Sequence, residues 1–308
     1  MSGHKMFKYA SSAHMEKIFA KDGFISFRCS RPNEFNDPYE LFLTIDRNCE
    51  PELLAFYSDA VGEIPQLPTT CFSRSPAIVP MWAHYAQNAS GFVVEIDEDS
   101  LHEAFPRKMV GNVEYRDSAD DQVQYVLRMA YTTCKPRHTY SLHRAVLHAS
   151  YFTKMAFWEY ELERRLVVLE TDVRKAGDIE LLDIPWDAVT RIVVGPSATE
   201  STKAFLREAA EKIGCPYLDF EISRISVIPH FRDQEGKVWR FEEGSFHPVP
   251  DLCEKCREPV SEEHDLCSFC LIQEADRVDA AKRNPYRILD HYGMLEGYIS
   301  AKNKGSSE

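Results

Sequence analysis

The apolar residues of this 308-residue chain follow a helical spacing in two long stretches. In Leu142–Ala156 they recur at i, i+3, i+4 and i+7, which places them on one face of a helix. Ala119–Thr132 has a similar apolar side. A shorter helix is expected over Ala13–Lys21, where a preceding serine can cap the start and Gly23 can adopt the left-handed conformation that ends a helix. These stripes predict amphipathic helices that pack against a core.

Strand-like segments lie among these helices. The candidates, read from alternation or from apolar runs, are Phe24–Arg28, Thr69–Ser73, Gly91–Ile96 and Arg165–Leu169. Further along, a strand at Ile192–Gly195, a helix at Thr202–Ile213 and a strand at Pro216–Ile222 form a strand–helix–strand unit. Strands scattered among helices without regular alternation predict an α+β domain, a mixed sheet with flanking helices, over residues 1–232.

The composition changes after this domain. Residues 233–250 are polar and contain several Pro and Gly, and we predict a linker there. Residues 251–272 contain two pairs of cysteines. Residues 273–308 are expected to form a helical tail, with helices near Glu274–Arg283 and Ile288–Ile299. The sequence therefore predicts a large domain followed by a small cysteine segment and a tail.

The two cysteine pairs have the spacing of a zinc site. Cys253 and Cys256 form one C-x2-C pair, and Cys267 and Cys270 form the other. Each pair brings two thiolates to one side of a tight turn, so that four sulfurs complete a tetrahedral shell. We predict a structural zinc ion, because a closed shell leaves no position for a substrate water. The surrounding acids favour a protein partner for this segment; they are Glu254, Glu258, Glu262, Glu263 and Asp265.

Charge and cysteine usage narrow the classes of function. The chain has 49 acidic and 36 basic residues, a net charge of −13, which argues against general binding to nucleic acid or to an anionic membrane. No apolar run approaches the roughly 20 residues of a membrane helix. Of the nine cysteines, the five outside the pairs have no recurring spacing, as expected for reduced thiols of a cytoplasmic protein.

Three separated motifs resemble those of one bacterial family. The first is Phe35–Glu40, with the sequence FNDPYE. The second combines CFS at Cys71–Ser73 with MWAHYA at Met81–Ala86 and GFVVE at Gly91–Glu95. The third is WEYELERR at Trp158–Arg165. In this order and spacing they resemble the family catalogued as domain of unknown function 2971, over roughly residues 7–225, with the cysteine segment as an added module.

The layout of that family is similar to ADP-ribosyltransferases, which use NAD, and the resemblance implies a site. In those enzymes a basic or aromatic residue on the first strand, a serine at a strand end and a later Glu-x-Glu surround NAD. The matching positions are Lys8 or Tyr9, then Ser73, then Glu161 and Glu163. Glu163 is expected to be the catalytic carboxylate, and Glu161 to orient the acceptor. The other residues expected around NAD are Asn36, Asp37, Trp82, His84 and Tyr85.

Each motif also has a structural explanation. The FNDP stretch suits a turn, and Trp82 and Tyr85 suit a core-facing helix side. Glu159, Glu161 and Glu163 occupy every second position and are followed by Arg164 and Arg165. This pattern also suits a structural network of ion pairs. Two function classes therefore remain, an NAD-consuming transferase of bacterial stress or phage defence and a non-catalytic binding module that recruits a partner. Convergence of the predicted residues on one pocket would favour the enzyme, whereas dispersal would favour the module.

Overall fold

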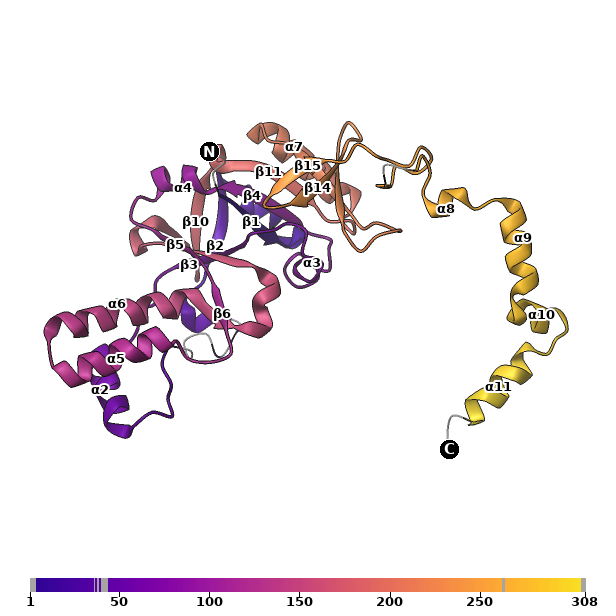
Figure 1. The fold of residues 1–308 in the computed structure, drawn as a ribbon. Coiled ribbons are helices and arrows are strands. Elements are labelled where there is room, and N and C mark those ends of the chain that lie inside the picture. The colour runs from indigo at the N-terminus through magenta and orange to yellow at the C-terminus, as the bar shows by residue number, and fades with distance from the viewer. Residues whose placement is uncertain (1–3, 36, 38, 40–43, 262–263, 306–308) are drawn as a thin grey trace. The chain divides into compact units, whose positions relative to one another are not determined.

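The computed structural model describes residues 4–35, 37, 39, 44–261 and 264–305 (Figure 1). The chain divides into two compact units. The first unit comprises residues 1–222 and 229–248, and the second comprises residues 223–228 and 249–308. The first unit has the predicted α+β fold with a mixed sheet, and the second contains the cysteine cluster and the helical tail. No helix in the described part of the chain has the length and apolar character needed to cross a membrane.

A ten-stranded sheet is the centre of the first unit, with the strand order β15-β14-β13-β12-β11-β4-β1-β3-β8-β5. Its neighbours are antiparallel except β11 and β12, which are parallel. The strands of its centre and one end are β1 (Lys5–Ala10), β3 (Thr69–Ser73), β4 (Phe92–Asp97), β5 (Met109–Asn112), β8 (Glu163–Val167), β11 (Val189–Val194) and β12 (Tyr217–Glu221). The first strand of the chain therefore lies in the middle of the sheet, where β3 and β4 flank it (Figure 1).

Both faces of the sheet are covered, which explains why its central strands are almost continuously apolar. On one face, Met6 of β1 belongs to a core shared with a three-stranded sheet of β2 (Phe24–Cys29), β10 (Ile179–Pro185) and β9 (Val173–Ala176). Phe7 packs on the opposite face in a second core. The helices nearest these layers are α1 (Met15–Ile18), α3 (Val79–Tyr85), α4 (Glu98–Ala104) and α7 (Glu200–Ile213). β1 is therefore fixed from both sides.

The predicted strand–helix–strand unit is present as β11, α7 and β12. Thr199 caps α7 by accepting a hydrogen bond from the Thr202 amide, and Gly214 ends it with a φ of 82°. Gly195 follows β11 where the chain passes very close to a neighbouring loop. A Cβ atom there would lie 2.2 Å from the carbonyl oxygen of Ala89, and the Gly195 amide donates to Gly91 O at 2.9 Å. Only glycine allows this close approach of two backbones.

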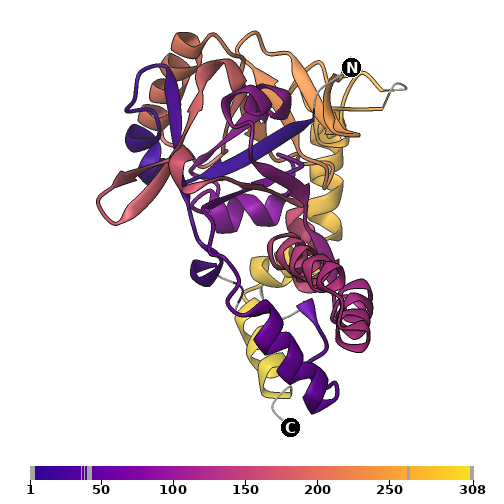
Figure 2. The same cartoon turned by 90° about the vertical axis from the view of Figure 1, so that its left-hand side faces the viewer.

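A three-helix layer forms a separate core beside the sheet. Its helices are α2 (Pro51–Val61), α5 (Asp121–Thr133) and α6 (Pro136–Phe152), which bury Leu53, Leu127 and Val146 between them. α5 and α6 lie side by side and extend away from the sheet (Figures 1 and 2). The apolar stripes predicted both of these helices, and α6 then leads through β7 (Thr153–Met155) back to the sheet. β7 pairs in parallel with β6 (Glu114–Arg116).

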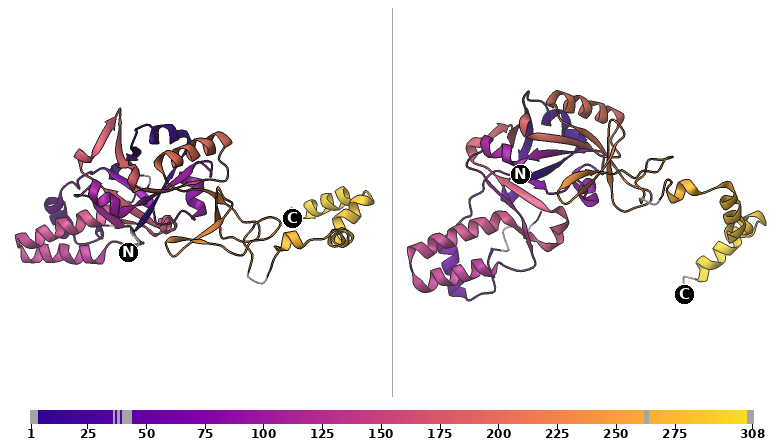
Figure 3. Two further views of the ribbon diagram at one scale, coloured as in Figure 1. Left: turned by 90° about the horizontal axis from the view of Figure 1, so that it is seen from above. Right: turned by 45° about the horizontal axis from the view of Figure 1, so that its top comes forward.

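Residues 233–250, where a linker is predicted, instead carry sheet strands. β13 (His230–Asp233), β14 (Val238–Glu242) and β15 (Ser245–Pro248) extend one end of the sheet as consecutive hairpins (Figure 3). The glycines of this stretch supply its turns, since Gly236 and Gly244 have positive φ. Phe241 and Phe246 pack against Phe7 of β1 at ring-centroid distances of 5.1 and 6.4 Å. The glycines thus belong to tight hairpins rather than to a linker.

The second unit contains short helices, α8 (Ser268–Leu271), α9 (Glu274–Arg283), α10 (Pro285–His291) and α11 (Leu295–Gly305). The predicted tail helices are present, with the second one divided in two. No residue of α8, α9 or α10 is buried. These helices therefore contribute few buried apolar residues to the second unit. Within its cysteine cluster, Cys253 and Cys267 are almost fully buried.

Gly195→Ala is expected to lower the free energy of unfolding by about 3 kcal/mol or more, because the added methyl group must displace backbone. Gly177→Ala is the control, since Gly177 has a φ of 63° but no atom within 4 Å of the added Cβ. It should lose only about 1–2 kcal/mol, the cost of a left-handed alanine. Urea unfolding followed by tryptophan fluorescence measures both. Equal losses would contradict the close-approach argument.

Candidate functional site

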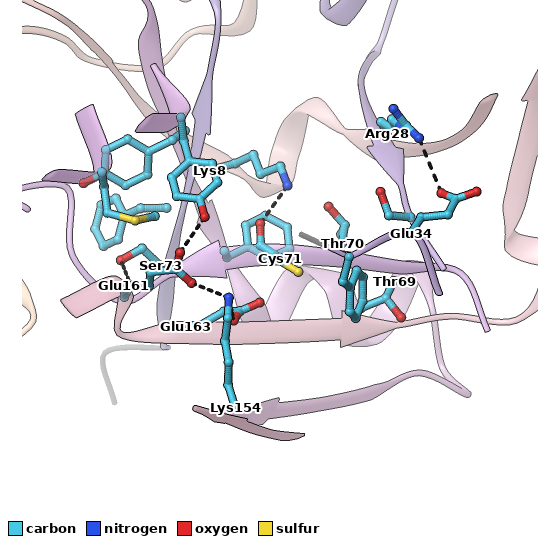
Figure 4. A pocket seen from close by; sticks show the side chains of 17 residues that line it. Lys8, Arg28, Glu34, Thr69, Thr70, Cys71, Ser73, Lys154, Glu161 and Glu163 are labelled. Carbon is cyan, nitrogen blue, oxygen red and sulfur yellow. Dashed lines mark hydrogen bonds and ion pairs between the residues drawn. The ribbon is translucent and has the colours of Figure 1, made fainter. Parts of the chain in front are cut away.

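A pocket of about 270 Å³ opens between β1, β3, β8 and β7 in the first unit (Figure 4). We call it the site pocket. Its polar lining includes side chains from the second and third motifs and from segments before and between the motifs: Lys8, Arg28, Glu34, Thr69, Thr70, Cys71, Ser73, Tyr85, Lys154, Glu161 and Glu163. Tyr9 and Phe35 also line it. The site pocket therefore brings together residues that are far apart in the sequence.

Lys8 interrupts the otherwise apolar centre of β1 and faces the site pocket (Figure 4). Its Nζ donates to the carbonyl oxygen of Cys71 at 2.7 Å. Among the described residues no carboxylate lies within ion-pair distance of Lys8. Burial lowers the pKa of the Lys8 ammonium, and neighbouring acidic groups offset this only in part. The site pocket thus contains a partly desolvated cation that an anionic ligand would stabilise.

The Glu-x-Glu pair arises from a turn and not from a continuous strand. The alternation of Glu159, Glu161 and Glu163 would place all three on one face if they lay on a strand, but the first two belong to the 3-10 helix η4 (Ala156–Glu161). Leu162 then adopts a left-handed φ of 46°, and β8 begins at Glu163. The three glutamates therefore do not lie on one strand, because the chain turns at Leu162. The carboxylates of Glu161 and Glu163 nevertheless meet at one lysine.

That lysine is Lys154 on β7, whose Nζ lies 2.7 Å from Glu161 Oε2 and 3.2 Å from Glu163 Oε2. Arg165 adds a bidentate contact to Glu163, with distances of 2.8 and 3.0 Å. All four side chains have relative exposures between 1% and 4%. We call them the charge cluster. Two acids and two bases balance each other, which is the condition under which charges are tolerated away from water.

The charge cluster keeps Glu163 ionised. Burial alone would raise the pKa of Glu163, but the adjacent Arg165 and Lys154 outweigh it and lower the pKa to about 2. Burial and the negative charge of Glu163 raise the pKa of the neighbouring Cys71 thiol, so this cysteine stays protonated. The site pocket therefore has a permanent carboxylate and an unreactive thiol at neutral pH.

The hydroxyl groups of the predicted site are held by hydrogen bonds. Ser73 is fully buried at the end of β3, and its Oγ donates to the Glu161 carbonyl oxygen at 2.7 Å. Tyr85 donates to Glu161 Oε1 at 2.5 Å from α3. Tyr9 donates to the Ser75 carbonyl oxygen at 3.0 Å, and burial raises the pKa of its phenol. These contacts fix the 3-10 helix that carries Glu161 relative to β3 and α3.

Three other predicted residues lie outside the site pocket. Trp82 is 1% exposed, stacks on Phe220 at 4.7 Å and donates to Pro76 O, so its ring is part of the core. His84 is exposed and lies 3.2 Å from the Tyr160 hydroxyl. Asp37 is buried and accepts from the Tyr39 amide, as expected in a turn. Asn36 lies outside the described residues.

Lys154 is the main member of the site that the sequence analysis did not identify. It is the only charged residue between the apolar end of α6 and Trp158, in the sequence YFTKMAFW. A lone lysine in such a run signals a buried cation that needs acidic partners. Cys71 was noted only as part of a motif, although its carbonyl oxygen holds Lys8. Arg164 does not join the charge cluster, because it forms a bidentate contact with Glu98.

An aromatic groove lies next to the site pocket and shares Tyr85 with it. Its lining consists of His84, Tyr85, Phe157, Trp158 and Tyr160. Phe157 is 80% exposed, which is unusual for a phenylalanine. Trp158 lies under the Lys154 ammonium, 4.8 Å from Nζ to the ring centroid. The groove, about 380 Å³ in volume, is therefore in direct contact with the charge cluster.

The four cysteines of the second unit come together as predicted. Their sulfur atoms all lie within 4.8 Å of one another, and those of Cys256 and Cys267 are 3.6 Å apart. Four thiolates at the usual Zn–S distance lie about 3.8 Å apart around a tetrahedral ion. The cluster thus has the donor set and spacing of a closed metal site.

Of the acidic residues expected around the cysteines, Glu262 and Glu263 lie outside the described residues. Glu258 is 8% exposed and turns inward, where it accepts from the Ser223 hydroxyl at 2.8 Å and from the Arg224 amide at 3.2 Å. It therefore ties residues 223–226 to the cysteine segment and does not contribute to an exposed acidic face. Lys255 and Arg257 are exposed beside it. The charge argument for a protein partner is weaker than the sequence suggested.

Comparison with known proteins agrees with the motif analysis. No curated protein matches the sequence. Among solved structures, Thermus sp. 2.9 DarT in complex with ADP-ribosylated ssDNA is similar to 70% of this chain and 90% of its own chain, with 10% identity and a TM-score of 0.30. Residues 81–166 match the model of the family described as a protein of unknown function, DUF2971. The resemblance to that family is thereby confirmed over the part of the chain that carries Glu161 and Glu163.

Proposed function

We propose that the first unit is an NAD-dependent enzyme of the ADP-ribosyltransferase type, acting in bacterial stress or phage defence. The observation that carries this proposal is the convergence of Lys8, Ser73, Tyr85, Glu161 and Glu163 on one pocket. They come from β1, β3, α3, η4 and β8, so neighbouring positions in the sequence do not account for it. A non-catalytic binding module offers no reason for this convergence and is the weaker candidate.

The charges of the site pocket suit NAD. Lys8 has no carboxylate partner among the described residues, and its burial makes a nearby anion favourable. The diphosphate of NAD supplies such an anion. Lys8 presents a compact charge and not the bidentate contact of an arginine, so it would attract the diphosphate without fixing its orientation. The hydroxyl groups and backbone of β3 would then orient the ribose.

Glu163 is the residue proposed to promote the reaction. In ADP-ribosyl transfer the bond between ribose C1′ and the nicotinamide nitrogen breaks, and its electron pair leaves with neutral nicotinamide. Positive charge develops on the ribose, and a fixed carboxylate stabilises it. A bond then forms from C1′ to the acceptor, which gives up a proton. Glu161, with one oxygen bonded to Tyr85 and the other to Lys154, is placed to orient the acceptor.

We also propose that the cysteine cluster holds a structural zinc ion. Four thiolates fill a tetrahedral shell and leave no open position for catalysis. With few buried apolar residues around it, the second unit depends on metal binding for its folding free energy. The zinc proposal and the enzyme proposal are independent, because the cysteines and the site pocket belong to different units.

Glu163→Gln is expected to reduce NAD turnover by about 10²–10³-fold, the cost of one preorganised electrostatic group, with a much smaller change in NAD affinity. NAD consumption by the purified protein, with and without cell extract as the source of acceptor, measures this. Glu98→Gln is the matched control, since Glu98 is similarly buried and pairs with Arg164 on the same strand outside the site pocket. If both variants lose stability and turnover in parallel, the catalytic role of Glu163 is wrong.

The contribution of ionised Glu163 to the stability of the fold is expected to decrease at acid pH. Its pKa falls from 4.5 to about 2 in the folded protein, so the ionised form stabilises the fold. That contribution is complete above about pH 4.5 and is lost as the pH falls toward 2, by up to about 1.4 kcal/mol per pH unit. The difference in unfolding free energy between wild type and Glu163→Gln should therefore narrow between pH 5 and pH 3. For Gly177→Ala the difference in unfolding free energy from wild type should not change with pH. If the difference for Glu163→Gln is also independent of pH, the lowered pKa of Glu163 is wrong.

Cys256→Ser is expected to lower the zinc content from about one ion per chain and to unfold the second unit alone. Metal analysis of the purified protein and limited proteolysis measure these effects. Cys134→Ser is the control, because Cys134 is exposed and lies far from the cluster in sequence. The NAD turnover of Cys256→Ser should stay close to that of wild type. A purified wild-type protein without bound metal, with the second unit still protease-resistant, would contradict the zinc proposal.

A further inference from the structure

The acidic residues of this chain are unevenly distributed. The net charge is −13, yet the sequence from Gln122 to Trp158 contains no Asp or Glu. This stretch covers most of α5, all of α6 and β7, and the start of the aromatic groove. Its basic residues are Arg128, Lys135, Arg137, Arg144 and Lys154, and it has three histidines. Of these basic residues, Arg128 pairs with Glu50 and Lys154 is buried in the charge cluster, so Lys135, Arg137 and Arg144 are the exposed cations of the stretch that form no ion pair with an acidic side chain among the described residues.

The exposed side of α6 concentrates these charges. Arg137, Tyr140, Ser141, Arg144 and His148 are spaced by three or four residues, so they share one face of the helix, and all are exposed. We call this the α6 face. Its opposite side packs into the three-helix core. Among the described residues no ion pair involves Arg137 or Arg144, and the α6 face also presents the ring of Tyr140, which is 65% exposed.

The α6 face leads along the chain to the aromatic groove. α6 ends at Phe152, β7 follows with Lys154, and Phe157 and Trp158 then form one wall of the groove. The exposed ring of Phe157 and the arginines Arg137 and Arg144 on the helix that precedes it are the two kinds of group that bind single-stranded nucleic acid, through base stacking and phosphate contacts. An acidic protein partner would use the cations but would leave Phe157 without a role. An anionic membrane would not require a groove.

We propose that the first unit binds single-stranded nucleic acid, with phosphates along the α6 face and one base stacked in the aromatic groove. Given the proposed NAD-dependent function, on which this part rests, the stacked base is the acceptor. It lies next to Glu161, which contacts Tyr85 of the groove wall at 2.5 Å. A nitrogen or oxygen of the base forms the bond to ribose C1′, nicotinamide leaves, and the base proton passes to solvent.

Binding of fluorescent 20-nucleotide single-stranded DNA and RNA, followed by anisotropy without NAD, tests the proposal. We expect binding that weakens with salt and is tighter than binding to the duplex. Phe157→Ala should weaken it about tenfold through lost stacking. Arg144→Ala should weaken it about fivefold at low salt and reduce the log–log salt slope by about 0.7, the effect of one phosphate contact. Comparing the affinities for the DNA and the RNA oligonucleotides shows which nucleic acid the protein prefers.

The controls are Tyr125→Ala, which removes a ring 64% exposed on α5, and Arg107→Ala, which removes an exposed charge outside the α6 face. Both should bind like wild type. The proposal is overturned by absence of binding at low salt, by equal losses in the controls, by duplex binding as tight as single-strand binding, or by preference for phosphatidylserine vesicles or polyglutamate. NAD turnover without oligonucleotide binding would overturn this proposal alone, whereas binding without turnover would overturn the proposed enzyme.

Discussion

The pairing of Glu161 and Glu163 with Lys154 and Arg165 is the interaction on which the site depends. Each of these charges is almost fully buried, and removing any one would leave a partner without compensation, at a cost of about 3–5 kcal/mol. The charge cluster joins β7, η4 and β8, and hydrogen bonds from the Ser73 hydroxyl to the Glu161 carbonyl oxygen and from the Glu163 amide to the Tyr115 hydroxyl act together with it. It also sets the chemistry, because the same cations that stabilise the fold keep Glu163 ionised.

The surrounding sheet makes such a cluster tolerable. β1 and β3 are covered on both faces, so the walls of the site pocket are closely packed. Low polarisability of the walls strengthens every electrostatic contact inside. Lys8 differs from Glu163 in this environment, because among the described residues no carboxylate forms an ion pair with its ammonium, which donates to the Cys71 carbonyl oxygen. The site pocket thus combines an ion-paired carboxylate with a cation that an anionic ligand would stabilise.

The sequence predicted those features that depend on local pattern. Stripes and alternation placed α5, α6, β3 and α7, and the two cysteine pairs predicted the cluster at Cys253. It did not predict what depends on contacts between distant segments. β14 and β15 have the composition of a linker and become strands because Phe241 and Phe246 pack on β1. Trp82 was expected at NAD, but its ring fills the gap between Tyr9 and Phe220.

The α6 face, the aromatic groove and part of the charge cluster all belong to one continuous segment, residues 136–167. α6, β7, η4 and β8 follow one another without a long loop, and they carry in turn the α6 face, Lys154, the aromatic groove and Glu163. In the binding that we propose, this segment holds an extended anionic ligand at one end and places its flat group beside the carboxylates at the other. The absence of acids before Glu159 then has a physical reason. Any carboxylate on this path would compete for Lys154 and repel the ligand that we propose, so a stretch without acids before Glu159 agrees with the proposed binding.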